Sequence, residues 1–339
     1  MILPGSDPAA IEAAAQSLAL GELIGLPTET VYGLGADADN PQAVARVFAA
    51  KGRPSDHPLI VHVTDASQAA HYADPIPPVA QRLMATHWPG PLTLILPRRA
   101  GVAEASAGGQ DSIGLRCPSH PVSQAVMRRA QALGVQGISA PSANRFGRVS
   151  PTTAAHVQDE LGSELLVLDG GACEVGIEST IIDCTRGRPV LLRPGMLSIE
   201  TLSAAAGEPV LSPQAFAQLH PAPAAAPRAS GTLESHYAPR ARVHLLSHAA
   251  LQARLDALAP EAQPSPSRPA CGVWARTALR VPHGAVLRAM PDHASECAHV
   301  LFAELRSFDQ LGVSDILVET PPSSTDWDGV RDRLTRAAA

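Results

Sequence analysis

The sequence predicts an α/β protein with two folded parts. Residues 1–206 alternate strand-like and helix-like segments, residues 207–239 are rich in Pro and Ala without a sustained period, and residues 240–339 resume the alternation. Such alternation is typical of layered α/β architectures, and 339 residues suffice for two domains. We therefore expect a mixed-sheet domain over 1–206, a linker over 207–239 and a smaller, doubly wound domain over 240–339.

Apolar spacing and helix-end residues predict the helices of the first part. Asp7 can cap a helix over residues 8–20, and Pro8 suits its first turn. Asn40-Pro41 starts a second helix that ends at Lys51. Further helices are expected at about 76–87, 120–133 and 152–162.

Short apolar runs bounded by turn residues predict the strands. The turn at Arg186-Gly187 indicates that the last two strands of the first part form a hairpin. The expected strands lie at 23–26, 58–63, 92–96, 112–116, 137–140, 165–168, 178–183 and 190–192.

The second part repeats the alternation on a smaller scale. Strands are expected at 243–246, 271–275, 285–287 and 316–319, with helices at 248–258 and 293–310. A final helix carries Arg331, Arg333 and Arg336. This pattern predicts a small Rossmann-like domain.

Composition excludes several classes of protein. The net charge of −6 argues against a chain-wide basic surface for nucleic acid, but it does not exclude a local basic pocket. The five cysteines are scattered and no two have CxxC spacing, so we expect buried free thiols. No signal peptide is recognisable, and no window approaches the ~20 apolar residues of a membrane span. A cytoplasmic protein is expected.

Two polar clusters follow strands or helices early in the chain. The segment 27–35 reads PTETVYGLG, in which two hydroxyls and a Gly-x-Gly turn could bind a carboxylate or phosphate or simply form a turn. The segment 51–58 reads KGRPSDHP. Its cations Lys51 and Arg53 could interact with the last carbonyls of the preceding helix, or they could bind a polyphosphate. A guanidinium fork beside a compact ammonium suits polyphosphate binding.

Later strands end in similar groups. Ser142-Ala143-Asn144 follows one strand, and these side chains could contact phosphate oxygens or form a serine-rich turn. Arg116 and Arg193 each end a strand, where open α/β sheets place ligands. Because Lys51, Arg53, Arg116 and Arg193 recur at element ends of an acidic chain, we expect them to converge on an anion.

Taken together, these clusters resemble one family, the Sua5/YrdC threonylcarbamoyl-AMP synthases. The strings PTETVYGLG, KGRPSDHPLIVH, WPGPLTLIL, GLRCPSHP, APSANRFGRVSPT, GIESTIID and LLRPG follow in the family's order over residues 22–195. Ser230-Gly231-Thr232 and the SHYAP string at 235–239 resemble the linker motif of the longer Sua5 form. Many members carry Lys and Tyr in this linker motif just before His-Tyr-Ala-Pro, where this chain has Leu233-Glu234-Ser235.

The resemblance implies a fold and a reaction. The fold would be a YrdC-like twisted mixed sheet with a concave pocket, followed by a Rossmann-like Sua5 domain. The enzyme would condense L-threonine with bicarbonate or CO2 and adenylate the carbamate with ATP and Mg2+, releasing diphosphate and water. A downstream tRNA threonylcarbamoyl transferase complex would then make t6A at adenosine 37, and weak contact with tRNA would be compatible with this role.

The resemblance also implies site residues. Lys51, Arg53, Ser142 and Asn144 would be catalytic. ATP would contact Lys51, Arg53, His57, Ser142, Ser150, Arg193 and, from the linker, His236 and Tyr237. L-threonine would contact Thr30, His62, Arg116, the Ala140 backbone and Ser179. No dedicated metal cage is recognisable, so Mg2+ would arrive with ATP.

Two other functions fit the same fold. An RNA-binding or ribosome-maturation protein would use a positive concave surface, but the chain has no RNA-binding motif, no basic run and few aromatics for base stacking. A carbamoyl transferase of the hydrogenase-maturation type would need acylphosphatase and zinc-finger modules, and neither is recognisable. We expect no covalent nucleophile, and we interpret Cys117 as a packing residue.

Overall fold

The computed structural model describes residues 1–219, 226–232, 236–258, 269 and 271–339. The chain divides into two compact units, the first comprising residues 1–146 and 150–232 and the second residues 147–149 and 233–339. The division at 232/233 lies inside the segment expected to be a linker. The prediction for Leu233-Glu234-Ser235 lies outside the described residues.

The first unit contains a mixed ten-stranded sheet in the order β1-β8-β2-β3-β7-β4-β6-β5-β9-β10. The sheet combines parallel pairs, such as β4 with β6, and antiparallel pairs, such as β5 with β6, so it is a mixed sheet. The strands are β1 Ile2–Pro4, β2 Ile24–Leu26, β3 Gly33–Asp37, β4 Ile60–His62, β5 Leu92–Pro97, β6 Ser112–Arg116, β7 Ile138–Ser139, β8 Leu166–Asp169, β9 Thr180–Asp183 and β10 Val190–Arg193.

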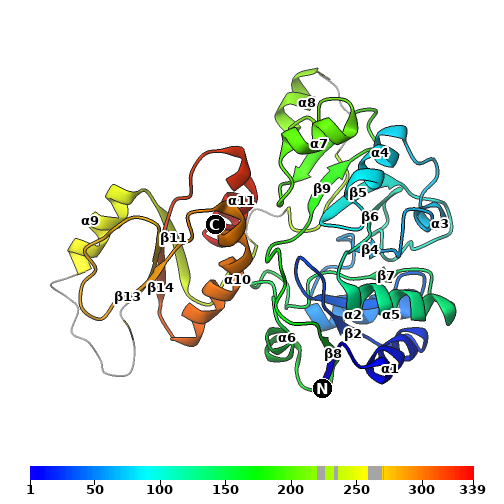
Figure 1. Cartoon of the computed structure of the whole chain (residues 1–339), viewed down its shortest axis with the longest axis horizontal. Helices are drawn as coiled ribbons and strands as arrows, with labels where there is room; N and C mark the ends of the chain where they lie inside the picture. The colour runs from blue at the N-terminus through cyan, green and yellow to red at the C-terminus, as the bar shows by residue number, and fades with distance from the viewer. Residues whose placement is uncertain (220–225, 233–235, 259–268, 270) are drawn as a thin grey trace. The chain divides into compact units, whose positions relative to one another are not determined.

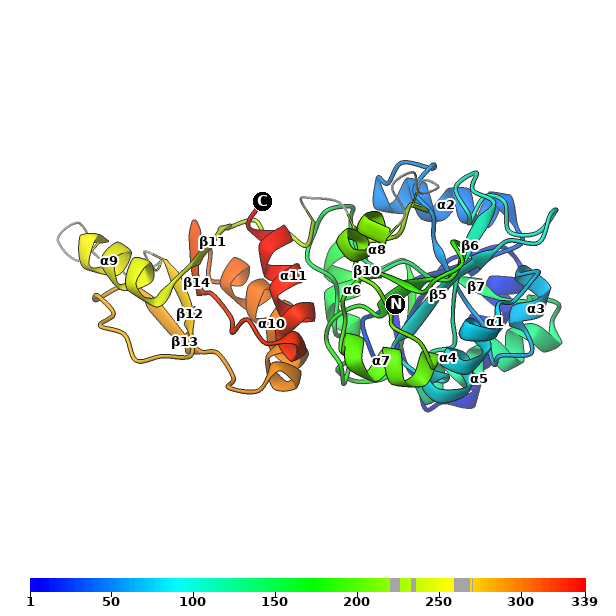
Figure 2. The ribbon, with the colours of Figure 1, turned by 90° about the horizontal axis from the view of Figure 1, so that it is seen from above.

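Helices cover both sides of this sheet. Figure 2 shows α2 on one side of the central strands and α1, α4, α5 and α7 on the other. The helices are α1 Pro8–Ala19, α2 Pro41–Lys51, α3 Ala69–Tyr72, α4 Pro78–His87, α5 Pro121–Ala132, α6 Ala154–Leu161, α7 Ile199–Ala206 and α8 Pro213–Leu219. As expected, Asp7 caps α1 and Asn40 caps α2, each through its side-chain oxygen.

The central strands bury one face and leave polar groups on the other. Val61, Leu94 and Leu115 belong to one hydrophobic cluster with residues of α4 and α7. Since successive strand residues point to opposite faces, their neighbours His62 and Arg116 project from the other face. The fold therefore keeps the polar ends of these strands away from the α4–α7 core.

The sequence missed some elements of the first unit. The Gly-x-Gly segment expected as a turn is the start of β3, which pairs antiparallel with β2 and β7. Strand packing is close here, since a Cβ on Gly33 would lie 3.0 Å from that of Ala140. Part of the expected linker is helix α8, where a proline occupies the helix start rather than breaking structure. The short elements β1, α3 and α7 were also not predicted.

The second unit contains a four-stranded parallel sheet in the order β11-β14-β12-β13. Figures 1 and 2 both show α9 on one face of this sheet and α10 and α11 on the other. This arrangement confirms the expected Rossmann-like domain. The elements are β11 Arg242–Leu246, α9 His248–Leu258, β12 Gly272–Ala275, β13 Val286–Ala289, α10 Ala294–Gln310, β14 Asp315–Glu319, the 3-10 turn Thr325–Trp327 and α11 Asp328–Ala337.

Candidate active site

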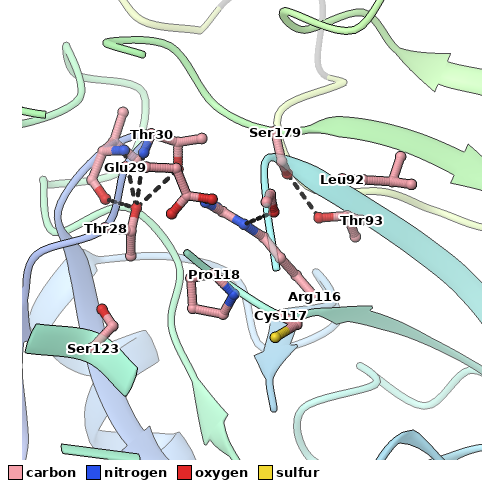
Figure 3. Close-up of polar contacts among 12 residues, drawn as sticks. Thr28, Glu29, Thr30, Leu92, Thr93, Arg116, Cys117, Pro118, Ser123 and Ser179 are labelled. Atoms are coloured by element: carbon pink, nitrogen blue, oxygen red, sulfur yellow. Dashed lines mark hydrogen bonds and ion pairs between the residues drawn. The ribbon is translucent and has the colours of Figure 1, made fainter. Parts of the chain in front are cut away.

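A polar row crosses the central sheet of the first unit. His62 on β4 is the register partner of Arg116 on β6, and Arg116 is in turn the partner of Thr93 on β5. Register partners project from the same face of a sheet, so the three side chains lie side by side. Ser179, directly before β9, extends the row, because its hydroxyl lies 2.7 Å from that of Thr93 (Figure 3). Thr93 was not predicted as a site residue. The signal for it in the sequence was a hydroxyl side chain within an otherwise apolar strand.

Arg116 has a buried carboxylate beside it. Nη2 of Arg116 lies 2.8 Å from Oε1 of Glu29, and each residue is 4% exposed. Figure 3 shows the Glu29 carboxylate directed from the loop before β3 toward Arg116. Sequence reasoning missed Glu29, since its two threonine neighbours favoured an ordinary turn.

The loop that carries Glu29 is held by its threonines. Thr28 Oγ1 donates to the carbonyl of Val31 over 2.6 Å and accepts from the backbone N–H of Thr30 over 3.2 Å. The Thr30 hydroxyl lies 2.9 Å from that of Thr28, and both side chains are buried. The predicted ligand Thr30 is thus part of a rigid turn beside the polar row.

His62 is almost completely buried, with 3% of its surface exposed. Burial, together with the nearby Arg116 guanidinium, holds the pKa of His62 well below its usual value. Its Nδ1 has no hydrogen-bond partner among the described residues. A neutral imidazole with one unused nitrogen is therefore available to a polar ligand.

Lys51 joins the two sequence clusters expected to bind nucleotide. The last residue of α2, it donates from Nζ to the carbonyls of Ser142 over 2.5 Å and of Asn144 over 2.6 Å. Burial and, to a lesser extent, the Arg53 guanidinium lower the pKa of Lys51 well below its usual value. The side chain fixes the 142–144 loop rather than capping its own helix.

Arg53 and Arg193 meet at Ser230. Nη2 of Arg53 donates to Ser230 Oγ over 3.2 Å, and Nη1 of Arg193 donates to the Ser230 carbonyl over 2.8 Å. Arg193 also donates from Nη2 to the carbonyl and Oγ of Ser179, over 2.9 and 3.1 Å. One hydrogen-bonded chain therefore connects residues expected to bind ATP with Ser179, expected to bind threonine.

The remaining predicted residues of the first unit lie around this chain. Ser150 donates to Glu178 Oε1 over 2.5 Å, and both are buried. The His57 ring makes an edge contact with Phe146, and burial lowers the pKa of His57. The Ala140 N–H donates to the Ile60 carbonyl over 3.1 Å, so a ligand contact there would use the Ala140 carbonyl.

His236 and Tyr237 belong to the second unit. The Tyr237 ring is buried against Phe302, with centroids 5.4 Å apart, and the Arg333 guanidinium lies 5.3 Å from its centroid. The His236 backbone N–H donates to the Arg336 carbonyl over 3.1 Å. Their expected role in ATP binding stays a prediction.

The five cysteines are buried and unpaired, as expected. Burial raises the pKa of Cys117 to about 11, which disfavours a nucleophilic thiolate. Within the described residues, no group of three or more His, Cys, Asp or Glu side chains could hold a metal ion. No helix in this part of the chain is long and apolar enough to cross a membrane.

Two family models together match most of the chain. Residues 16–195 match the Sua5, YciO and YrdC model, described as "Telomere recombination". Residues 197–339 match the Sua5 C-terminal model, described as "Threonylcarbamoyl-AMP synthase, C-terminal domain".

Curated relatives and a solved structure agree with these matches. The threonylcarbamoyl-AMP synthases of Pyrococcus abyssi and Bacillus subtilis are each 44% identical over 207 residues, covering 61% and 60% of this chain. These matches span 60% and 58% of the relatives' own length. The structure of P. abyssi Sua5 complexed with L-threonine matches with a TM-score of 0.83 at 35% identity, over 97% of this chain and 94% of that one.

Proposed function

The chain belongs to the Sua5 family of threonylcarbamoyl-AMP synthases, and we propose that it makes L-threonylcarbamoyl-AMP. L-threonine and CO2 or bicarbonate would form a carbamate, which ATP adenylates with release of diphosphate and, from bicarbonate, water. The observation that carries this proposal is the buried row of His62, Arg116, Thr93 and Ser179, connected through Arg193 to Arg53.

The row suits an amino acid with a hydroxyl side chain. Arg116 offers a guanidinium that can hold a carboxylate, and the paired hydroxyls of Thr93 and Ser179 can exchange hydrogen bonds with a third hydroxyl. Burial strengthens both interactions, because little water competes for them. That P. abyssi Sua5 was solved with L-threonine supports L-threonine as the ligand of this chain.

The cations nearby suit adenylation. Attack of a carbamate oxygen on the α-phosphorus increases negative charge on the phosphate oxygens, which preplaced cations stabilise. Arg53 and Arg193 would supply this charge, while Lys51 would hold the loop of Ser142 and Asn144 against the nucleotide. Holding three reactants together would provide much of the rate enhancement.

Mg2+ would enter with the phosphates of ATP. The described residues offer no carboxylate cage for it, so we assign no protein ligand to the ion. Bound to the phosphates, it would neutralise the departing diphosphate.

The product must be consumed by another enzyme. A threonylcarbamoyl transferase would move the group to tRNA to form t6A, so this protein would act in the cytoplasm at the first step of that modification. The transferase and tRNA are proposed as partners from the reaction, and not from the residues of the polar row.

Diphosphate release tests the function directly. Purified protein with ATP and Mg2+ should release diphosphate only when L-threonine and bicarbonate are both present. Omission of either substrate, or replacement of L-threonine by D-threonine, should reduce release to background. Release that is indifferent to threonine would refute the proposal.

A further inference from the structure

The Glu29 carboxylate is buried, and within the part of the chain that the structure describes nothing donates a hydrogen bond to it. Its side chain is 5% exposed, and neither Oε1 nor Oε2 accepts a hydrogen bond from any described residue. Nη2 of Arg116 lies 2.8 Å away but is not aligned as a donor. Because buried carboxylates normally accept several hydrogen bonds, this acceptor capacity suits a ligand with hydrogen-bond donors.

The unused groups gather at one place. His62 Nδ1 and Arg116 Nη2 also lack a hydrogen-bond partner within the described residues, and the two side chains are register neighbours. Three buried polar groups with unmet capacity therefore surround the subsite assigned to L-threonine. A buried ion pair with unsatisfied atoms is costly unless a ligand completes it.

The charges of the pair complement those of a free amino acid. Arg116 can hold the α-carboxylate, and Glu29 beside it can hold the α-ammonium. The Glu29–Arg116 pair and the zwitterion are each neutral, so binding exchanges one ion pair for two without burying net charge. An amino acid would thus be selected over a simple hydroxy acid.

We propose that Glu29 binds the α-ammonium of L-threonine and then accepts a proton from it; this inference rests on the proposed function. An ammonium nitrogen has no lone pair and cannot attack carbon. Transfer of one N–H proton to a Glu29 oxygen leaves a neutral amine and a neutral carboxylic acid. The amine lone pair then forms the N–C bond to CO2, one C–O π bond becomes the carboxylate, and the nitrogen loses its second proton to water.

Ligand binding separates this role from a structural one. Glu29→Gln keeps the side-chain size but removes the charge, and should weaken L-threonine binding about ten- to hundredfold in calorimetry. Binding of 3-hydroxybutanoate, which keeps the carboxylate and hydroxyl but lacks the amine, should not weaken, because the loss of the Glu29 charge leaves Arg116 free to hold its carboxylate. Equal weakening of both ligands would show that Glu29 only positions Arg116, and would overturn the proposal.

The pH profile tests the proton transfer. In Glu29→Gln only threonine already deprotonated in solution can react, so kcat/KM for L-threonine should rise more steeply with pH in this variant than in the wild type, where Glu29 accepts the proton from bound threonine. Parallel profiles would overturn the proposal. Glu29→Asp, which retains the carboxylate, should retain the wild-type discrimination between the two ligands; loss of that discrimination would contradict the role of the charge.

Two controls keep the outcomes distinct. Glu12→Gln removes the carboxylate of another Glu–Arg pair, that with Arg129 on the surface, and should leave threonine binding unchanged. Threonine-dependent diphosphate release by the wild type is measured first. If it is absent, the proposed function fails; if it is present and Glu29→Gln behaves as the wild type, only the role of Glu29 fails.

Discussion

The ammonium of Lys51 donates a hydrogen bond to the carbonyl oxygen of Asn144 over 2.6 Å, 93 residues away in sequence. A second bond reaches Ser142 in the same loop. The lysine at the end of α2 therefore sets the position of two residues expected to face the nucleotide.

Lys51→Met should nearly abolish diphosphate release while leaving the protein folded. The loop would lose two hydrogen-bond donors, and we expect activity to fall by at least about 100-fold, as for other losses of preorganised electrostatics. The free energy of unfolding should change by less than about 3 kcal/mol, because only the two carbonyls lose a partner. Urea unfolding and the diphosphate assay measure the two effects; full activity in the folded variant would contradict the assignment.

Arg53→Ala should weaken the use of ATP more than that of threonine. Arg53 contacts the Pro58 carbonyl and Ser230 Oγ, outside the row that we assign to threonine. We expect kcat/KM for ATP to fall about 100-fold or more, with a smaller change in threonine binding. Arg188→Ala, which removes an exposed arginine paired with Glu208, is the charge-matched control and should retain activity.

Ser179→Ala should raise the KM for L-threonine. Ser179 Oγ contacts the Thr93 hydroxyl and Arg193, so its loss removes one hydrogen-bonding group from the expected hydroxyl subsite. We expect about a tenfold increase, as for the loss of one buried hydrogen bond, with the KM for ATP almost unchanged. Thr93→Val, nearly isosteric, should produce a similar change. If KM for ATP rose instead, Ser179 would belong to the nucleotide subsite.

Local patterns were sufficient to predict the elements that the site depends on. The ends of α2, β6 and β10 were expected at Lys51, Arg116 and just before Arg193, and the structure has them there or within one residue. Capping residues and apolar periods are local signals, so one sequence suffices to read them. The resemblance of the ordered motifs to the Sua5/YrdC family then predicted that these cations share one pocket.

Sequence alone could not provide the contacts between segments. The adjacency of His62, Arg116 and Thr93 depends on strand register, which is set by pairing across distant parts of the chain. Glu29 was overlooked for the same reason, because its ion-pair partner Arg116 lies 87 positions later in the sequence. Gly33 and Gly35 indicated a turn locally, whereas close strand packing explains them in the structure.

His62 should make the stability of the protein depend on pH. Its pKa in the folded state is well below the usual 6.5, because burial and Arg116 disfavour the imidazolium. Below pH 6.5 the unfolded chain therefore binds a proton that the folded one does not, so the free energy of unfolding falls as pH falls, until the folded-state pKa is reached. For one proton this dependence cannot exceed about 1.4 kcal/mol per pH unit. His62→Gln cannot take up this proton, so its urea-unfolding stability should decline less steeply over that range, whereas above pH 7 the two curves should run parallel. Identical slopes below pH 6.5 would mean that His62 is protonated as readily in the folded protein as in the unfolded chain, and the neutral imidazole that we place beside the substrate would be wrong.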